Sequence, residues 1–240
     1  MRAGRIRSKA RIQTIFIMNR RLEKDIKTML CDEMASLGIY YAVDESDMRR
    51  GFTLIFGPED SRYANCPLLF SVEYPLDYPI SPPIVRILTS DGHTRFHPNL
   101  YIEGKVCLSI LGTYPGPSWV SSMNIGSVFK SIISLLDNNP IVNEPGWESY
   151  NEKHPAAKAY ADFVEFHLVK HTLKEYEKYR DGKNTLWSHF SDTFEQFWPN
   201  HLEKIQNRLK LKALDEPNHC TNILYGMQGT IHWAKLLPRT

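Results

Sequence analysis

The sequence predicts an α+β fold, and three observations lead to this prediction. An amphipathic helical pattern stands near the N-terminus and is followed by a series of short strand-like runs. Longer helical patterns then fill most of the second half of the chain. Helices grouped before and after a run of strands, instead of alternating with them, are typical of the α+β class.

The first predicted helix covers residues 20–36. Its apolar residues, from Leu22 to Leu30, recur at spacings of three and four, which places them on one face of a helix. Gly38 provides a stop just beyond it. The opposite face is charged, and it is either a solvated surface or a docking face for another protein.

Four short runs rich in aromatic and β-branched residues predict an antiparallel meander. They cover 39–43, 52–56, 67–74 and 84–88, with polar turns after the first two. A proline-rich segment at 74–83 leads into the last run. Because proline cannot donate to a strand ladder, this segment predicts a short rigid loop.

From residue 88 to about 119 the sequence shows little periodicity and many glycines and prolines. Long irregular segments inside compact domains are often functional. A largely buried helix is predicted next, over 125–136, and longer helices over 154–179 and 186–211. Pro199 is expected to kink or divide the last of these. The final thirty residues follow no clear pattern.

Length and composition set broad limits on function. The chain has 240 residues, which indicates one large domain or one domain with an extension. Its formal net charge of +2 implies no strong preference for nucleic acid or membrane, so no nucleic-acid partner is expected. No apolar run approaches the roughly 18 residues of a membrane span. Residues 1–19 are basic and predict a disordered arm, with a mitochondrial transit peptide as the lesser alternative.

Four cysteines stand at 31, 66, 107 and 220 without the spacing of a zinc site, so we expect reduced thiols and no metal. Cys107 lies in the irregular segment, close to His93 and His97. Taken alone it is a metal ligand, the nucleophile of a cysteine–histidine hydrolase, or a buried structural thiol. The last of these is the most common state of a free cysteine.

The residues around Cys107 argue against a purely structural thiol. HPN at 97–99, followed by Gly104 and VCLSIL at 106–111, is similar to the active-site signature of ubiquitin-conjugating enzymes. The upstream YPLDYPISPPIVRILT resembles the proline-rich stretch of that family. Trp119, the helix at 125–136 and NEPGW at 143–147 follow in family order. GKVCLSILGTYPGPSW and NNPIVNEPGWE most resemble the family's Z branch, which also carries a helical C-terminal extension.

The resemblance implies a UBC-like fold and a division of the chain. It assigns residues 20–160 to the catalytic domain and 161–240 to a mainly helical extension. Whether that extension packs on the catalytic domain or recruits a partner stays open. The expected localisation is the cytoplasm and nucleus.

The resemblance also implies a reaction. Cys107 would accept ubiquitin or a ubiquitin-like modifier from an activating enzyme as a thioester and pass it to a lysine amine or a ligase. Asn99 would donate a hydrogen bond to the oxyanion of that transfer or brace the loop beside it. Glu144 would orient and deprotonate the lysine, unless it is an ordinary solvated loop residue. Supporting roles in the active-site loop fall to His97, Pro98 and Trp119.

Partner surfaces follow from the resemblance in the same way. Contacts with the activating enzyme or with ligases are expected at Arg20, Arg21, Lys24, Lys27, Ile80, Ser121 and Ser122. No cofactor is expected on the protein, since ATP is used by the upstream activating enzyme, and the chain is expected to be a monomer. The alternative function is a non-catalytic ubiquitin-binding scaffold, but such variants lack the cysteine.

Three features depart from the usual family pattern. After Trp119, Val120, Ser121 and Ser122 replace the SPA with which many members bind RING-type ligases, so only Ile80 keeps the apolar character of that surface. The other two departures are closer to Cys107. Ser109 stands where many members carry an aspartate, and GTYPGPS at 112–118 lengthens the loop after Cys107. Both lie beside the expected thioester, where they are placed to influence the choice of acceptor or modifier.

Overall fold

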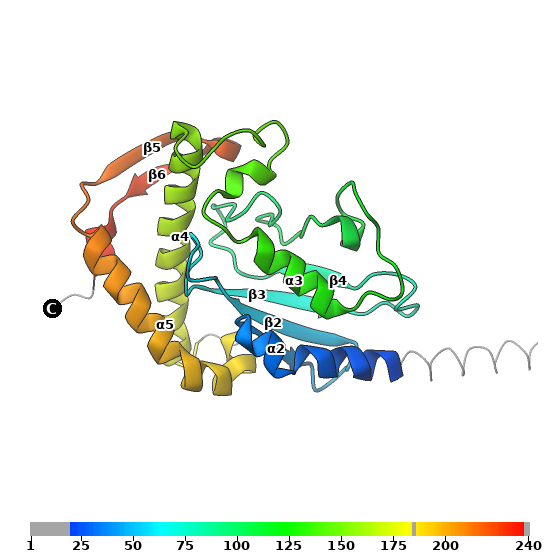
Figure 1. Cartoon of the computed structure of the whole chain (residues 1–240). Helices are drawn as coiled ribbons and strands as arrows, with labels where there is room; N and C mark the ends of the chain where they lie inside the picture. Colours follow the sequence, from blue (N-terminus) through cyan, green and yellow to red (C-terminus); the bar gives the residue numbers. More distant parts are fainter. Residues whose placement is uncertain (1–19, 184–185, 238–240) are drawn as a thin grey trace, which may run out of the picture.

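A four-stranded antiparallel sheet with helices on both faces forms the centre of the molecule (Figure 1), so the α+β prediction is confirmed. The computed structural model describes residues 20–183 and 186–237. The predicted basic arm at 1–19 lies outside these residues. Within them, no helix is both long and apolar enough to cross a membrane.

The N-terminal helix is shorter than the sequence predicts. The chain is helical at 20–29 and leaves the helical conformation at Cys31, and the short helix α2 follows at Asp32–Ser36. This break turns α2 so that Met34 is buried in the core, whereas Leu30 is 60% exposed. The prediction of one continuous helix over 20–36 was therefore wrong in the middle of that range. Leu30 does not belong to the buried apolar face of the helix.

The four strands form the predicted meander, in the order β1-β2-β3-β4. Their bounds are Ile39–Val43, Arg50–Phe56, Pro67–Glu73 and Ile84–Ile87. Each pair of neighbours is antiparallel. The sheet is the platform on which the irregular segment and the helices are placed.

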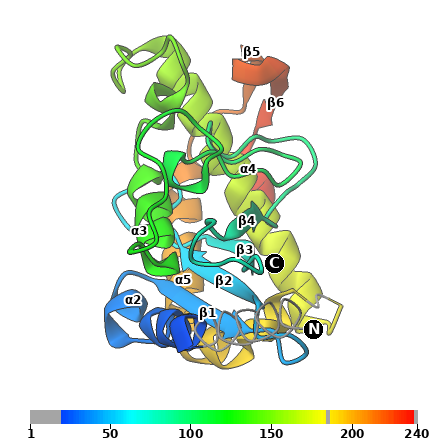
Figure 2. The same cartoon turned by 90° about the vertical axis from the view of Figure 1, so that its right-hand side faces the viewer.

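Both faces of the sheet are covered. Phe70 of β3 pairs with Thr53 of β2, and its ring meets Phe129 of helix α3 (Ile125–Leu135) at 5.6 Å. Because side chains alternate along a strand, Phe52 and Phe56 point to the other face. There they contact aromatic residues of η3 (Trp187–Phe190) and of α5 (Ser191–Lys212), which runs behind the sheet in Figure 2.

The C-terminal part of the chain shares a helix with the rest. Helix α4 spans Pro155–Arg180, so the predicted division at residue 160 falls inside it. Pro199 lies within α5, which continues through it as one helix and is not divided. A cluster of aromatic rings joins α4 to η3 and α5, made by Tyr176, Tyr179, Trp187, Phe194 and Trp198.

The last residues form a β-hairpin that the sequence did not predict. Strands β5 (Asn218–Ile223) and β6 (Met227–Ile231) are joined by a short turn, η4 (Leu224–Gly226), and η5 (Trp233–Leu236) follows. The hairpin runs alongside α4 (Figure 1), and Trp233 of η5 packs its ring against that of Phe166 in α4. The extension therefore combines helices with a second small sheet.

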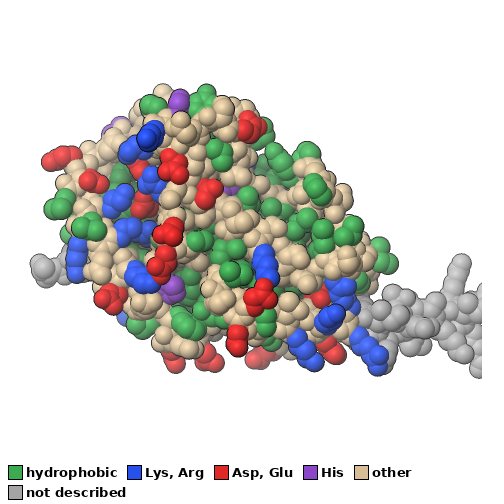
Figure 3. All heavy atoms as spheres, viewed as in Figure 1, with side chains coloured by type: hydrophobic (Ala, Val, Ile, Leu, Met, Phe, Trp, Pro, Cys, Tyr) green, Lys and Arg blue, Asp and Glu red, His purple; other side chains and the backbone are tan. Residues whose placement is uncertain are grey.

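The surface has no dominant charge on the side that Figure 3 shows. Basic and acidic side chains are interleaved over α4 and α5. This agrees with the formal net charge of +2 for the whole chain.

Candidate active site

Cys107 lies in the irregular segment, just after a bridge between Leu100 and Val106. Its backbone N–H donates to the carbonyl of Asn99 at 2.8 Å. Its Sγ lies 3.3 Å from the carbonyl oxygen of Thr113, and only 5% of the residue is exposed. The thiol is thus held between the HPN turn on one side and the loop at 112–118 on the other.

Asn99 is joined to Cys107 twice. Besides the backbone bond, its Nδ2 donates to the Cys107 carbonyl at 2.7 Å. Its Oδ1 is buried, with no hydrogen-bond partner in the described part of the chain. Of the two predicted roles, the geometry matches the bracing of the loop.

His97 is buried inside the turn that carries Asn99. Its Nδ1 accepts from the Asn99 backbone N–H at 3.0 Å, and its Nε2 lies 3.1 Å from the carbonyl of Leu135. Since a carbonyl can only accept, Nε2 carries the proton. Burial lowers the pKa of His97 to about 3, so the ring is neutral at physiological pH. Both ring nitrogens are engaged with the backbone, which leaves His97 unsuited to act as a base for the thiol.

Thr113 is a functional candidate that sequence reasoning missed. Its hydroxyl donates to the Val106 carbonyl at 2.7 Å and accepts from the Leu108 N–H at 2.9 Å, on either side of Cys107. Its backbone carbonyl oxygen accepts a hydrogen bond from the Cys107 thiol. Nothing in its sequence position marked it, because the loop at 112–118 has no periodicity from which its fold could be inferred.

The same loop lies over Ser109, in η1 (Ser109–Leu111). A Cβ atom added at Gly116, where φ is +139°, would lie 2.9 Å from the Ser109 Cβ. The two departures beside Cys107 are therefore in contact, and a small residue at each position allows the loop to approach.

Trp119 supports a neighbouring loop. Its Nε1 donates to the carbonyl of Pro79 at 2.8 Å, and its ring lies 6.0 Å from that of Tyr78. Its hydrogen bond thus goes to the proline-rich segment and links the chain after Cys107 to that segment.

Most of the predicted partner contacts are exposed, but Arg21 is engaged within the fold. Its guanidinium donates to the Ser121 carbonyl at 2.7 Å and lies 3.0 Å from the carboxylate of Asp25. Arg21 therefore joins the first helix to the chain after Trp119. The exposed positions are Arg20, Lys24, Lys27, Ile80, Ser121 and Ser122.

Glu144 is half-buried and in contact with the C-terminal hairpin. It follows η2 (Pro140–Asn143), and its Oε2 accepts from the hydroxyl of Tyr225 at 2.5 Å. Asn143 lies 3.5 Å from the Nε2 of His97, which ties this loop to the HPN turn. Sequence reasoning had no signal for Tyr225, since it lies 81 residues from Glu144.

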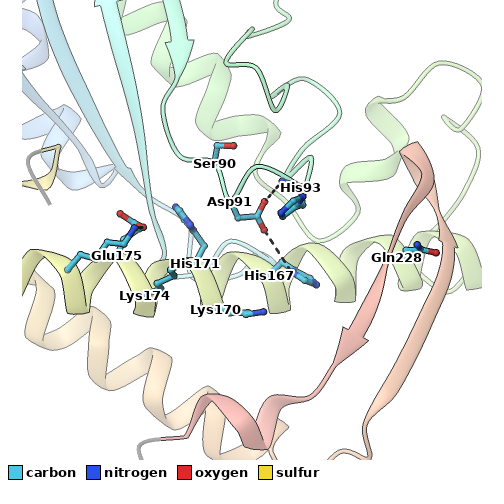
Figure 4. Close-up of a pocket in the computed structure, with 10 residues that line it drawn as sticks. Ser90, Asp91, His93, His167, Lys170, His171, Lys174, Glu175 and Gln228 are labelled. Carbon is cyan, nitrogen blue, oxygen red and sulfur yellow. Dashed lines mark hydrogen bonds and ion pairs between the residues drawn. The ribbon is translucent and has the colours of Figure 1, made fainter. Parts of the chain in front are cut away.

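A separate groove of about 520 Å³ lies beside α4, between the loop at Ser90–His93 and β6 (Figure 4). Asp91 accepts from backbone N–H groups within its own loop, and Glu175 pairs with Lys178 at 2.7 Å. Burial lowers the pKa of His167, so this side chain adds no charge at neutral pH. In residues 20–183 and 186–237, no three His, Cys, Asp or Glu side chains are grouped as metal ligands.

Comparisons with known proteins show which family the chain resembles. A family model described as ubiquitin-conjugating enzyme matches residues 21–165, which include Asn99, Cys107 and Glu144. Over 199 residues the chain is 36% identical to ubiquitin-conjugating enzyme E2 Z of Danio rerio, covering 80% of this chain and 58% of that protein. It is 41% identical over 152 residues to ubiquitin-conjugating enzyme E2 Z of Homo sapiens, covering 62% of this chain and 42% of that protein.

The chain thus spans about half the length of the curated relatives that it matches. Among solved structures, the E2 domain of a Toxoplasma gondii ubiquitin conjugating enzyme is 22% identical, with a TM-score of 0.48. That match covers 65% of this chain and 97% of the other.

Proposed function

The chain belongs to the ubiquitin-conjugating enzyme family, and we propose that it carries ubiquitin or a ubiquitin-like modifier as a thioester on Cys107. It accepts the modifier from an activating enzyme and passes it to a lysine amine or to a ligase. The observation that carries the proposal is the double hydrogen bond between Asn99 and Cys107, which fixes the cysteine in the HPN turn.

The first step exchanges one thioester for another. The Cys107 thiolate attacks the thioester carbonyl carbon at the C-terminus of the modifier, and the thiolate of the activating enzyme leaves. Because a thioester replaces a thioester, the step needs no cofactor on this chain, and ATP is consumed upstream. A cysteine suits the position because the thiolate is both a strong nucleophile and a good leaving group.

In the second step an amine replaces the thiolate. Once the lysine ammonium has lost a proton, its nitrogen attacks the thioester carbonyl, an oxyanion forms, the bond to Cys107 breaks and the leaving thiolate takes the second nitrogen proton. Glu144 is the residue we assign to orient the lysine and accept the proton that the ammonium loses before attack. Asn99 holds the Cys107 backbone in place and has one further amide hydrogen for the oxyanion.

A cysteine hydrolase fits the residues less well. Such an enzyme needs an imidazole directed at the thiol. The ring nitrogens of His97 are instead engaged with Asn99 and Leu135. This arrangement supports the transferase over the hydrolase.

Partner binding is proposed at two exposed regions. The first helix presents Lys24 and Lys27 to an activating enzyme. Ile80 is 74% exposed and suits an apolar ligase contact, together with Ser121 and Ser122. We propose that the protein works in the cytoplasm and nucleus as a monomer.

A charging assay tests the function. The protein is incubated with ATP, a panel of activating enzymes and each modifier, and a reductant-sensitive adduct is expected for at least one pair. Cys107→Ser should give a reductant-resistant ester instead, while Cys220→Ser, at a cysteine in the hairpin, should behave as wild type. A modifier that binds but never forms an adduct would favour the non-catalytic scaffold and contradict the proposal.

A further inference from the structure

The turn of the C-terminal hairpin reaches the loop that carries Glu144. Tyr225 lies in this turn, between β5 and β6, and its hydroxyl donates to Glu144 Oε2 at 2.5 Å. The hairpin belongs to the extension, whereas Glu144 lies in the loop between α3 and α4 (Figure 1). A segment beyond the matched family region thus contacts the proposed catalytic acid.

Tyr225 is also linked to the HPN turn, through the side chain of Arg95. Its ring lies 4.1 Å from the guanidinium of Arg95, and the ring of Tyr101 lies 3.6 Å from the same guanidinium. The same guanidinium donates to the carbonyl of Pro98. The Arg95 carbonyl in turn accepts from Tyr160 of α4 at 2.9 Å. One tyrosine is therefore linked both to the turn that holds Cys107 and to Glu144.

The backbone of Tyr225 indicates that its side chain matters. Tyr225 has φ 65° and ψ 21°, and Gly226 follows at φ 68°. Two successive positive φ values are usual in hairpin turns, where Asn, Asp or Gly normally adopts them. A bulky residue is rare in this region because its Cβ is crowded there. Since the turn itself would form more easily with glycine, the tyrosine is better explained by what its ring and hydroxyl contact.

We infer that Tyr225 is a positioning residue for Glu144, and that the C-terminal hairpin thereby completes the active site. This inference rests on the proposed function. The hydroxyl holds Oε2, which leaves Oε1 of the carboxylate for the incoming lysine. Oε1 first takes a proton from the lysine ammonium. The neutral nitrogen then attacks the thioester carbonyl carbon, the carbon–sulfur bond to Cys107 breaks, and the leaving thiolate takes the second nitrogen proton.

The choice of amine separates positioning from a general structural role. Free lysine is protonated at neutral pH and must lose a proton before it can attack. Hydroxylamine is a much weaker base and is largely unprotonated there. A residue that acts through Glu144 should therefore affect discharge to lysine and leave discharge to hydroxylamine unchanged.

The experiment compares Tyr225→Phe with Tyr176→Phe in the full chain. Tyr176 is the matched control, because its ring packs on Trp198 away from the hairpin turn. For Tyr225→Phe we expect charging of Cys107 within twofold of wild type, discharge to lysine about 10-fold slower and discharge to hydroxylamine unchanged. Equal loss with both amines would show a structural effect and overturn the inference.

A double-mutant cycle with Glu144→Gln identifies the partner. If Tyr225 acts through Glu144, adding Tyr225→Phe to the Glu144→Gln variant should slow discharge to lysine no further. An independent loss in that double variant would overturn the inference. So would a Tyr225→Phe protein that discharges to lysine as wild type does while Glu144→Gln does not.

The outcomes also distinguish the inference from the function on which it rests. If no thioester forms on the wild-type protein, the proposed function fails. If charging is normal and Glu144→Gln discharges to lysine normally, the role of Glu144 and this inference both fail, while the thioester on Cys107 stands.

Discussion

At the scale of single residues, Cys107 is held from two sides by groups of different origin. Asn99 belongs to the HPN turn, whose residues identify it in the sequence. Thr113 belongs to the lengthened loop. Its hydroxyl forms hydrogen bonds with the backbone of Val106 and of Leu108, the residues on either side of Cys107. Short motifs identify a nucleophile well, whereas the hydrogen bonds that orient it depend on loop geometry that no periodicity encodes.

Thr113→Val should weaken the site without changing its volume much. The substitution removes a hydroxyl that bonds to both Val106 and Leu108, at a net cost of about 0.5–1.5 kcal/mol for each bond. We expect the free energy of unfolding to fall by about 1–3 kcal/mol, as measured by urea denaturation, and charging of Cys107 to slow. Thr113→Ser, which keeps the hydroxyl, is the control. Equal charging rates for the two variants would exclude this role.

His97 should make stability depend on pH. Its folded-state pKa, about 3, is below the value of about 6.5 of an unfolded histidine, because burial disfavours the charged ring. Between these two values the unfolded state binds one proton more than the folded state. The stability from His97 is therefore fully present above about pH 6.5 and is lost as the pH falls toward 3.

Urea denaturation from pH 7.5 to pH 4 measures this effect. His97→Gln retains a donor for Leu135 and does not titrate. Relative to that variant, the wild type should lose about 1.4 kcal/mol more for each pH unit in the lower part of the range. Parallel pH profiles for the two proteins would contradict the expected titration of His97.

At the scale of elements, one buried carboxylate joins α4, α5 and the loop before β3. Glu165 of α4 is 4% exposed and lies 2.9 Å from Arg62, 3.5 Å from Lys212 and 3.8 Å from Arg208. Arg62 also pairs with Asp162 at 2.8 Å. Burial acts to lower the pKa of Arg62, but its bonds to the two acids outweigh this and raise it.

Glu165→Ala should destabilise the protein by about 3–5 kcal/mol, because removing one partner of a buried ion pair leaves charges without compensation. Thermal and urea unfolding would measure the loss. Glu33→Ala is the matched control, since Glu33 pairs with Lys130 on the surface, where such pairs contribute at most about 1 kcal/mol. Similar losses for the two variants would show that the network of Glu165 contributes little.

The elements also show where sequence reasoning succeeds and where it stops. Alternating and helical periodicity identified the four strands of the meander and helices α3, α4 and α5. It missed the break at Cys31, because Leu30 continues the apolar spacing. It missed the hairpin because β5, Asn218–Ile223, has few β-branched residues and its turn uses Tyr225 where Asn or Asp is expected.

At the scale of the whole molecule, the extension is part of the core. The sheet buries one face under α3 and the other under η3 and α5. The burial of both faces could not be predicted, because Phe52 and Phe56 read as ordinary strand residues and their partners lie more than 130 residues away. The active-site signature, by contrast, is compact in sequence and could be identified from it.

Loss of the extension should therefore unfold or aggregate the catalytic region. A chain ending at residue 183 would expose the sheet face now covered by α5, which includes Tyr40, Phe52 and Phe56. Large exposed apolar patches promote aggregation and bind hydrophobic dyes. We expect the truncated chain to be insoluble, or to bind such a dye with loss of charging at Cys107.

A single substitution separates this packing role from a recruiting role. Phe194→Ala in the full chain removes a ring buried between Phe56 and Trp187, at a cost of about 3–5 kcal/mol in the free energy of unfolding. Leu214→Ala, at a residue that is 84% exposed beyond α5, should change it by less than about 0.5 kcal/mol. If the extension served only to recruit a partner, Phe194→Ala would leave the stability of the sheet unchanged, and the truncated chain would stay soluble and accept the modifier. Since the rings of α5 lie directly on the sheet, we expect the opposite result in both measurements.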